Sequence, residues 1–230
     1  MNVGYHLAKF GAKVLLVDMD PQGSLTVFMG LEPNDLEDSV YNAIAQEEDL
    51  PIFEDIHGMS LAPSNILLSR AEMELASAIM RELRLKNALS PLQSSFDFIL
   101  VDCPPSLGLL SIMSLVASTH VLIPIQTEFK ALKGTELLTR TISEIIRAAN
   151  KQLKIAGIVP TMYDSRLIQG TQSLDSIKKL SQQIAPILSV IPRKTDFANA
   201  SQEKLPLSLY SPQSPAVACL QEIAKKLENL

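Results

Sequence analysis

The chain has 230 residues, of which 47% are hydrophobic and 20% are charged, so it can bury a core and is not disordered by composition. Its net charge of −5 excludes DNA binding by bulk charge, and no apolar run approaches the roughly 18 residues that a membrane span needs. The two cysteines and three histidines are scattered, so neither a disulfide framework nor a zinc site is indicated.

In chain order, the first predicted element is a helix that ends at Gly11, a residue suited to the left-handed position after a helix. An apolar run at residues 14–17 predicts a buried strand. Residues 32–55 are acidic and are interpreted as a solvated helix and loop without chemistry. A capping box at residues 69–72 then predicts a helix that continues to residue 83, because apolar residues recur there at every fourth position.

Four more apolar runs predict strands that are covered on both faces, because they are apolar throughout rather than alternating. Serine followed by proline at residues 214–215 predicts the start of the last helix. Since strands alternate with helices, we expect an α/β fold with a mostly parallel twisted sheet, in a single domain over residues 1–230. The four strand-like runs cover residues 98–101, 121–125, 155–159 and 187–191.

Two carboxylates follow the first predicted strand, in the segment DMDPQG at residues 18–23. Ligands bind at the carboxyl ends of strands in open parallel sheets. Carboxylates there are unfavourable unless a cation or a water network uses them. A polar turn is the structural alternative. Because the whole segment is more particular than such a turn, we interpret Asp18 and Asp20 as functional.

Asp102 follows the apolar run at residues 98–101, which is the Walker B pattern for holding magnesium, often through water. Pro104, Pro105 and Gly108 come next and would form a stiff but hinged loop. We interpret Cys103 as a buried small hydrophobic residue and not a nucleophile, because no histidine or lysine nearby in the sequence would lower its pKa.

Six segments, in this order along the chain, resemble successive blocks of the ParA/Soj partition ATPases, which are relatives of MinD. The ordered set is more specific than any single block and covers the chain from about residue 2 to its C-terminus. The segments are DMDPQG, LAPSN, FDFILVDCPPSLG, VLIPIQTEFKALKG, GIVPTMYDSR and VIPRKTDFANA.

The resemblance implies a three-layer P-loop NTPase-like fold and a magnesium-dependent ATPase. ATP would join two protomers in a homodimer that binds nonspecific DNA, and a ParB-like partner would stimulate hydrolysis and release. The protein would be cytoplasmic and nucleoid-associated, without a membrane contact. Asp20 would position or activate the attacking water, Asp18 and Asp102 would organise Mg²⁺ through water, and Gln22 would belong to the first switch.

Further positions follow from the same resemblance. Pro104, Pro105 and Gly108 would belong to the second switch, and Met162 and Pro192 would lie near the adenine.

Residues 124–128 would form a loop that faces the nucleotide and the dimer partner. Relatives grip DNA with surface arginines, which correspond here to Arg166 and Arg193. Many relatives carry a second arginine where this chain has Asp196, which weakens the DNA assignment around Arg193.

The family's phosphate loop, KGGVGKTT, is not found in this sequence, because none of the nine glycines is followed by lysine. That loop cradles phosphates with backbone N–H groups, holds the β and γ groups with a lysine and binds magnesium with a threonine hydroxyl. Residues 2–11 instead resemble the helix that follows it. We therefore expect an N-terminally incomplete domain that lacks the P-loop strand and does not bind or hydrolyse Mg-ATP by itself.

Three explanations compete: a truncated reading frame, which we prefer, a pseudo-ATPase that still pairs with partners, and a split protein whose loop comes from another chain. The genomic sequence upstream of Met1 distinguishes them. The absent strand would lie centrally in the sheet. Losing several buried aliphatic side chains at about 1.5–3 kcal/mol each rivals a typical stability of about 5–15 kcal/mol, so we expect a poorly stable or aggregating chain.

Two other functions stay open: a non-catalytic interaction protein and a MinD-like membrane-associated ATPase. The membrane function would need a basic amphipathic C-terminal helix. The predicted terminal helix has balanced charges and one apolar face, so we interpret it as a packed helix. That face comprises Val217, Leu220, Ile223, Ala224 and Leu227.

Overall fold

The computed structural model describes the backbone of residues 1–230 and the side chains of residues 1–128 and 134–230. Its contacts divide the chain into two compact units, which are described separately. The first unit comprises residues 1–118 and 200–206, and the second comprises residues 119–199 and 207–230. The α/β class is confirmed, whereas the single domain over residues 1–230 stays a prediction.

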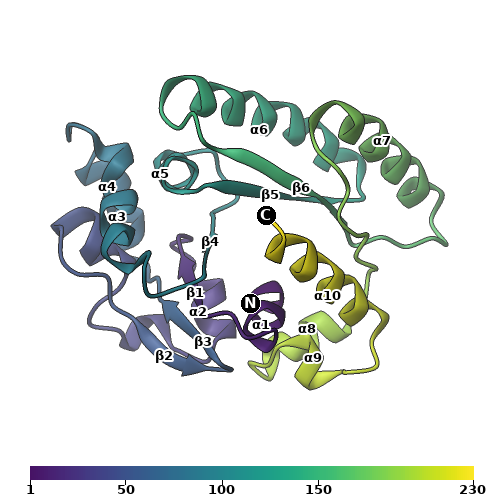
Figure 1. Ribbon diagram of the computed structural model, residues 1–230, viewed down its shortest axis with the longest axis horizontal. Coiled ribbons are helices and arrows are strands. Elements are labelled where there is room, and N and C mark those ends of the chain that lie inside the picture. Colours follow the sequence, from purple (N-terminus) through teal and green to yellow (C-terminus); the bar gives the residue numbers. More distant parts are fainter. The chain divides into compact units, whose positions relative to one another are not determined.

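The first unit is built on a four-stranded, mostly parallel sheet (Figure 1). Its strands are β1 (Val14–Asp18), β2 (Phe53–Ile56), β3 (Met59–Ala62) and β4 (Phe98–Asp102). They lie in the order β2-β3-β1-β4, in which β1 pairs in parallel with β3 and β4, and β2 pairs antiparallel with β3. The strands predicted at residues 14–17 and 98–101 are confirmed. The sequence analysis missed β2 and β3, which are four residues long and lie in or beside the acidic stretch.

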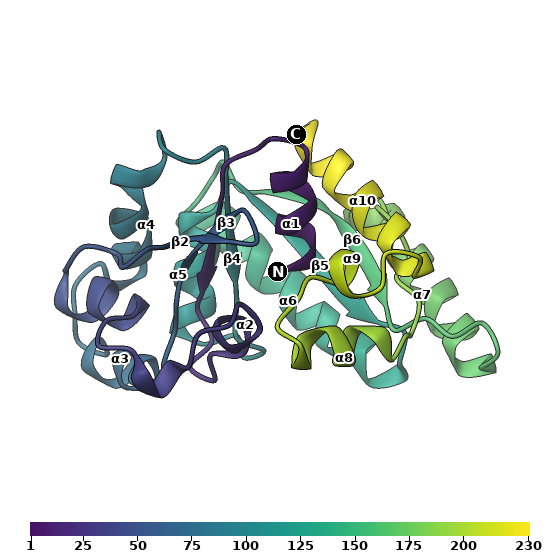
Figure 2. The same ribbon diagram turned by 90° about the horizontal axis from the view of Figure 1, so that it is seen from below.

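Helices cover both faces of this sheet (Figures 1 and 2). On one face lies α1 (Asn2–Lys9), which Gly11 ends with a φ of +104°, as predicted. Gly4 lets α1 approach closely, because a Cβ atom there would lie 2.9 Å from Leu16 Cδ2. On the other face, the main core joins Leu15 and Val17 to three helices. These are α3 (Leu68–Glu74), α4 (Arg84–Leu89) and α5 (Leu109–Ala117).

The single helix predicted over residues 69–83 is wrong. After α3, Ile79 is 88% exposed, and Met80 adopts a φ of +55°, which a helix does not allow. The 3-10 turn η3 (Arg81–Leu83) then leads into α4. The Arg81 guanidinium donates to the carbonyl oxygens of Leu75 and Ala76 just beyond α3, and the Leu75 carbonyl also accepts from the Ala78 N–H at 3.1 Å.

The second unit contains a parallel pair of strands, β5 (His120–Gln126) and β6 (Lys154–Thr161), which confirms two more predicted strands. One face of this pair carries α6 (Phe129–Ala148) and α7 (Ile168–Ile184), and the other carries α10 (Pro215–Glu228) (Figures 1 and 2). The chain passes between α7 and α10 through α8 (Asp196–Gln202) and α9 (Leu207–Tyr210).

The last helix, α10, begins at Pro215 after an extended Ser214, as predicted, but the Ser214 side chain makes no capping hydrogen bond. Its apolar face is buried, which confirms a packed helix. The five predicted positions, Val217, Leu220, Ile223, Ala224 and Leu227, are all buried.

The fifth predicted strand, at residues 187–191, is not a regular strand. This segment runs parallel to β6 and is joined to it by hydrogen bonds, including one from the Leu188 N–H to the Ile158 carbonyl at 3.0 Å. Only isolated bridges form, because Pro160 in β6 has no N–H to donate to a ladder.

Among the strands described, β4 lies at one edge of the first sheet and β5 at one edge of the second, and both are apolar parallel strands.

Over the described residues, no helix has both the length and the apolar character required to cross a membrane.

Gly157 in β6 lets the segment 187–191 lie against the strand, because a Cβ atom there would lie 2.5 Å from Leu188 Cγ and 3.0 Å from the Pro186 carbonyl oxygen. We expect Gly157→Ala to lower the free energy of unfolding by about 1–3 kcal/mol through overpacking, measured by chemical denaturation. The control is Gly134→Ala in α6, where no atom lies within 4 Å. Helix propensity should make that variant up to about 1 kcal/mol more stable. Equal effects of the two substitutions would contradict this account.

Candidate functional site

Three predicted carboxylates gather at the carboxyl edge of the first sheet. Asp18 and Asp102 are the last residues of β1 and β4 and are paired in register, and Asp20 lies two residues beyond Asp18. Burial raises the pKa of Asp18 and of Asp102, and the negative charges of Asp102 and Asp20, respectively, add to these rises. The three carboxylates predicted from the strand ends therefore form one cluster.

The Asp18 side chain is fully buried and accepts three hydrogen bonds. Its Oδ2 accepts from the backbone N–H and the hydroxyl of Thr26, both at 2.8 Å, and its Oδ1 accepts from the Asp20 N–H at 3.1 Å. Burial raises the pKa of Asp18 to about 6, while these hydrogen bonds favour the charged form and limit the rise. Asp18 is therefore held in place by donors and ionises near neutral pH.

Thr26 is a residue that the sequence analysis missed. It lies in α2 (Ser24–Phe28) and is fully buried. Its hydroxyl accepts a hydrogen bond from the Ser64 N–H at 2.9 Å while it donates to Asp18. Thr26 thus connects the Asp18 carboxylate to the LAPSN segment. The only signal in the sequence was its place in the short helix that follows DMDPQG.

Asp20 and Gln22 form a tight turn after β1. The Asp20 Oδ1 accepts from the Gln22 N–H at 3.0 Å, and the Asp20 carbonyl accepts from the Gly23 N–H at 2.9 Å. Gly23 has a φ of +63°, which favours glycine. The Asp20 side chain is half-buried and Gln22 is exposed, so both can meet a ligand from solvent.

The loop after Asp102 contains Pro104, Pro105 and Gly108 and is mostly exposed or half-buried. Surrounding protein atoms raise the pKa of Asp102, and the amino group of Met1 opposes this rise. The expectation that Cys103 is a buried small hydrophobic residue is wrong, because it is exposed directly after β4. Desolvation nevertheless raises the pKa of its thiol, which does not favour a nucleophile.

Glu72 contacts the end of this loop, which corrects its predicted role in a local capping box. The Glu72 Oε1 accepts a hydrogen bond from the Leu109 N–H at 2.9 Å, so it caps α5 instead of α3. A Cβ atom at Gly108 would lie 2.5 Å from that oxygen, so the glycine permits the contact. The Ser69 hydroxyl donates to the Ile66 carbonyl at 2.7 Å.

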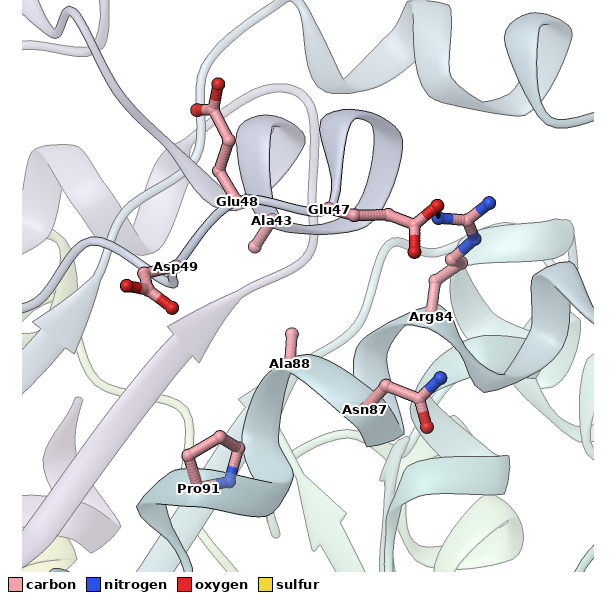
Figure 3. Close-up of a pocket in the computed structure, with 8 residues that line it drawn as sticks. All are labelled: Ala43, Glu47, Glu48, Asp49, Arg84, Asn87, Ala88 and Pro91. Atoms are coloured by element: carbon pink, nitrogen blue, oxygen red, sulfur yellow. Dashed lines mark ion pairs between the residues drawn. The ribbon is translucent and has the colours of Figure 1, made fainter.

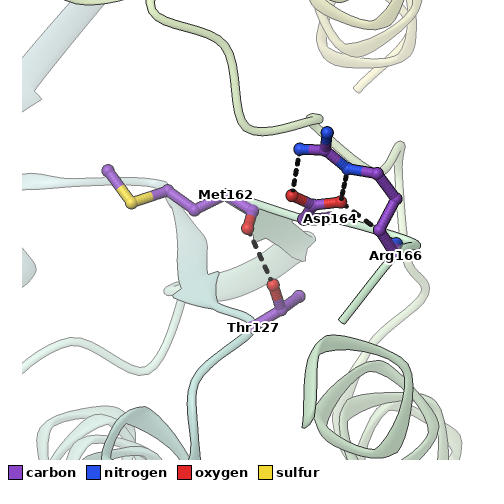
Figure 4. Close-up of polar contacts among 4 residues, drawn as sticks. All are labelled: Thr127, Met162, Asp164 and Arg166. Carbon is purple, nitrogen blue, oxygen red and sulfur yellow. Dashed lines mark hydrogen bonds and ion pairs between the residues drawn. The ribbon is translucent and has the colours of Figure 1, made fainter. Parts of the chain in front are cut away.

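The remaining predicted site residues belong to the second unit. Met162 follows β6 with a φ of +54°, and its carbonyl accepts from the Thr127 hydroxyl at 3.1 Å (Figure 4). Pro192 forms an isolated bridge with Tyr163. Met162 and Pro192 are therefore near each other at the carboxyl end of β6, and the Met162 side chain is 45% exposed.

Both predicted DNA-contact arginines are exposed and paired with carboxylates. Arg166 donates from Nε to Asp164 Oδ1 at 2.9 Å and from Nη2 to Oδ2 at 2.7 Å (Figure 4). Arg193 donates from Nη2 to Glu128 Oε1 at 3.2 Å.

The carboxylate cluster suits magnesium that is held together with phosphate. Where side chains are described, no three histidine, cysteine, aspartate or glutamate residues are placed to enclose a metal ion. Magnesium at phosphate sites commonly keeps several waters and takes only one or two carboxylates from the protein. Asp18 and Asp102 fit that partial role.

A cavity of about 180 Å³ lies elsewhere in the first unit and contains none of the predicted site residues (Figure 3). Glu47, Glu48 and Asp49 line it, following the π-helical turn η2 (Asn42–Gln46), together with Arg84 and Asn87 of α4. Arg84 forms an ion pair with Glu47. The acidic stretch thus lines this cavity and does not contribute to the carboxylate cluster.

Known proteins resemble the chain over nearly its full length. A family model described as an AAA domain matches residues 1–155. The sporulation initiation inhibitor protein Soj of Bacillus subtilis is 38% identical, over 99% of this chain and 90% of that protein. The chromosome partitioning protein ParA of Myxococcus xanthus is 34% identical, over 99% of this chain and 81% of that protein.

Among solved structures, cobyrinic acid a,c-diamide synthase from Mycobacterium smegmatis matches with a TM-score of 0.86 and 34% identity, over 99% of this chain and 86% of that chain. That protein has also been solved with bound ADP and magnesium. The parallel sheet, with carboxylates at the ends of β1 and β4, therefore defines a P-loop NTPase-like protein. The chain belongs to the Soj/ParA family of partition ATPases.

Asp18 makes the stability of the first unit depend on pH. Its folded-state pKa of about 6 lies above the usual carboxyl value of about 4, so between these values the folded protein keeps a proton that the unfolded chain releases. This contribution to stability is present at low pH and is lost as the pH rises through about 6. From about pH 5 to about pH 7, we expect the free energy of unfolding to fall by about 1 kcal/mol more in the wild type than in Asp18→Asn.

Urea denaturation at the two pH values measures this difference, because the asparagine variant cannot ionise at residue 18. Identical pH dependence in the two proteins would show that Asp18 does not titrate in this range.

Proposed function

We propose that the chain acts in DNA partitioning as the ATP-dependent switch of a Soj/ParA system. The observation that carries the proposal is the cluster of Asp18, Asp20 and Asp102 at the ends of adjacent parallel strands, in a chain 38% identical to Soj over nearly its whole length. Partitioning is named in its sequence relatives, whereas the synthase name belongs to the Mycobacterium protein.

Each carboxylate has a distinct task in this proposal. When bound, ATP supplies the phosphoryl group and Mg²⁺ neutralises its negative charge. Asp18, buried and oriented by Thr26, and Asp102 would hold a bound Mg²⁺ ion through its waters. Asp20, half-buried at the tip of the turn, orients the attacking water. Gln22, in the same turn, belongs to the first switch and responds to the state of the nucleotide.

The loop after β4 is the second switch, with Pro104, Pro105 and Gly108 limiting how it moves. The hydrogen bond from the Leu109 N–H to Glu72 of α3 supports this role, because a movement of the loop can break or keep that bond.

In the second unit, Met162 and Pro192 contact the adenine, and Arg166 and Arg193 contact DNA phosphates. Where a phosphate loop holds Mg-ATP, the nucleotide would join two copies of the chain and a ParB-like partner would stimulate hydrolysis. The protein acts in the cytoplasm on the nucleoid. The exposure of Met162, at 45%, supports a contact with a flat ring. The exposure of the Arg166 side chain, at 86%, supports contact with a large partner.

A chain of these 230 residues does not bind Mg-ATP by itself, because none of its nine glycines is followed by lysine to form a phosphate loop. Calorimetry with magnesium and a nonhydrolysable ATP analogue should therefore show no binding heat. Binding heat that is lost in Asp102→Ala would refute this expectation and would place the metal site at the carboxylate cluster.

The second candidate function is a non-catalytic interaction protein. ATP hydrolysis by the purified chain would exclude it. A MinD-like membrane ATPase is less well supported, because the apolar face of α10 is buried and is not available to lipid. Pelleting with anionic liposomes distinguishes it from DNA binding.

DNA retardation tests the partition function directly. At low salt and without ATP, we expect the arginines of the second unit to let the wild type retard nonspecific duplex DNA, and Arg166→Ala to weaken binding and to reduce the salt slope by about one. The matched control is Arg140→Ala, since Arg140 is also exposed and also paired with a carboxylate, that of Glu144. No retardation by the wild type, or equal loss in both variants, would reject this DNA surface.

A further inference from the structure

Arg166 reaches solvent with much of its charge already balanced by Asp164. The two groups form a bidentate pair, in which Nε and Nη2 of the guanidinium each donate to one carboxylate oxygen, at 2.9 and 2.7 Å (Figure 4). Such paired contacts are the strongest geometry for an arginine and a carboxylate. One edge of the guanidinium is thus occupied by a group with the same charge sign as a phosphate.

The backbone fixes Asp164 in position. The Asp164 Oδ1 also accepts from the Arg166 N–H at 3.0 Å, and its carbonyl accepts from the Leu167 N–H at 3.2 Å. The first turn of α7 packs against the same carbonyl, since a Cβ atom at Gly170 would lie 2.8 Å from it. The Asp164 side chain is 14% exposed, against 86% for Arg166, so the carboxylate is part of the fold and the arginine is attached to it.

We propose that Asp164 restrains the contact of Arg166 with DNA phosphate. The carboxylate holds one donor edge of the guanidinium and reduces its net charge, so a phosphate must compete with Asp164 for Arg166. This inference rests on the proposed DNA-binding function of Arg166.

Electrostatics predict that the pairing with Asp164 lowers the affinity of Arg166 for DNA. Affinity for DNA depends on cations that replace the counterions of phosphates, and an arginine paired with a carboxylate replaces fewer of them. The Arg166 guanidinium lowers the pKa of Asp164 to about 2, so the carboxylate stays charged at neutral and mildly acidic pH. Ordinary changes of pH therefore leave the pair intact.

Arg193 shows a weaker form of the same arrangement. It makes one hydrogen bond to Glu128, at 3.2 Å, and both side chains are about half exposed. The restraint on Arg166 is therefore the stronger of the two, because it has two short hydrogen bonds and a carboxylate fixed by the backbone.

The substitution Asp164→Asn separates charge from structure, because the amide oxygen can still accept the Arg166 N–H in the turn. In DNA retardation at low salt, we expect this variant to bind about fivefold more tightly than the wild type, with a steeper salt dependence. The matched control is Glu144→Gln, which makes the same charge change and releases the exposed Arg140 in α6. The control should change affinity much less.

A double variant completes the test. In an Arg166→Ala background, Asp164→Asn should act no more strongly than Glu144→Gln, because the restrained group is gone. If Arg166→Ala weakens binding but Asp164→Asn gives no gain beyond the control, the restraint is wrong although the DNA surface stands. Weaker binding by Asp164→Asn would show that Asp164 positions Arg166 for DNA. If Arg166→Ala has no effect, the DNA surface itself fails.

Discussion

The buried carboxylate of Asp18 organises the first unit, because a charged group without contact to water needs donors from several parts of the chain. Those donors come from the turn at Asp20 and from Thr26 in α2, and Thr26 in turn receives the Ser64 N–H. The end of β1, the turn, α2 and the LAPSN segment therefore adopt one arrangement together. The register between β1 and β4 then brings Asp102 opposite Asp18. The proposed site for a metal ion and phosphate therefore lies beside one buried acid and its donors.

Close approaches in the fold depend on glycine at positions where a side chain from elsewhere must enter. Gly108 allows Glu72 to cap α5, and Gly157 allows Leu188 to pack on β6. The first contact links α3 to the loop after Asp102, and the second holds the extended segment that leads to Pro192. In each unit, a glycine thus permits a close contact with a segment that leads to the carboxyl ends of the strands, where the proposed ligands bind.

Carboxylates occur both at the proposed metal site and beside the proposed DNA-contact arginines of this acidic chain. Burial raises the pKa of both Asp18 and Asp102, and neighbouring carboxylates add to each rise, as expected for acids placed close together. The arginines at the proposed DNA surface are each paired with a carboxylate. Carboxylates thus stand at the proposed metal site and beside the arginines of the proposed DNA surface, which a net charge of −5 alone would not indicate.

Much of the framework was predictable from sequence. Unbroken apolar runs located β1, β4, β5 and β6, because such runs are typical of strands in parallel sheets. Burial on both faces was predicted for all of them, but β4 and β5 are largely half-buried or exposed. The polar residues after those runs located the carboxylate cluster. The prediction failed for the helix at residues 69–83, where Met80 adopts a φ of +55°, and for residues 187–191, where Pro160 in β6 interrupts the ladder.

The sequence by itself determined which residues stand at the strand ends, and hence the family and the chemistry to expect, because those motifs are local and ordered. Only the tertiary structure decided their partners. Thr26 with Asp18, Glu72 with the Leu109 N–H and Arg193 with Glu128 join positions 8, 37 and 65 residues apart. Even the short-range pair of Asp164 and Arg166 depends on how the first turn of α7 packs. Such contacts depend on the packing of whole elements, and a local pattern of residues carries no record of that packing.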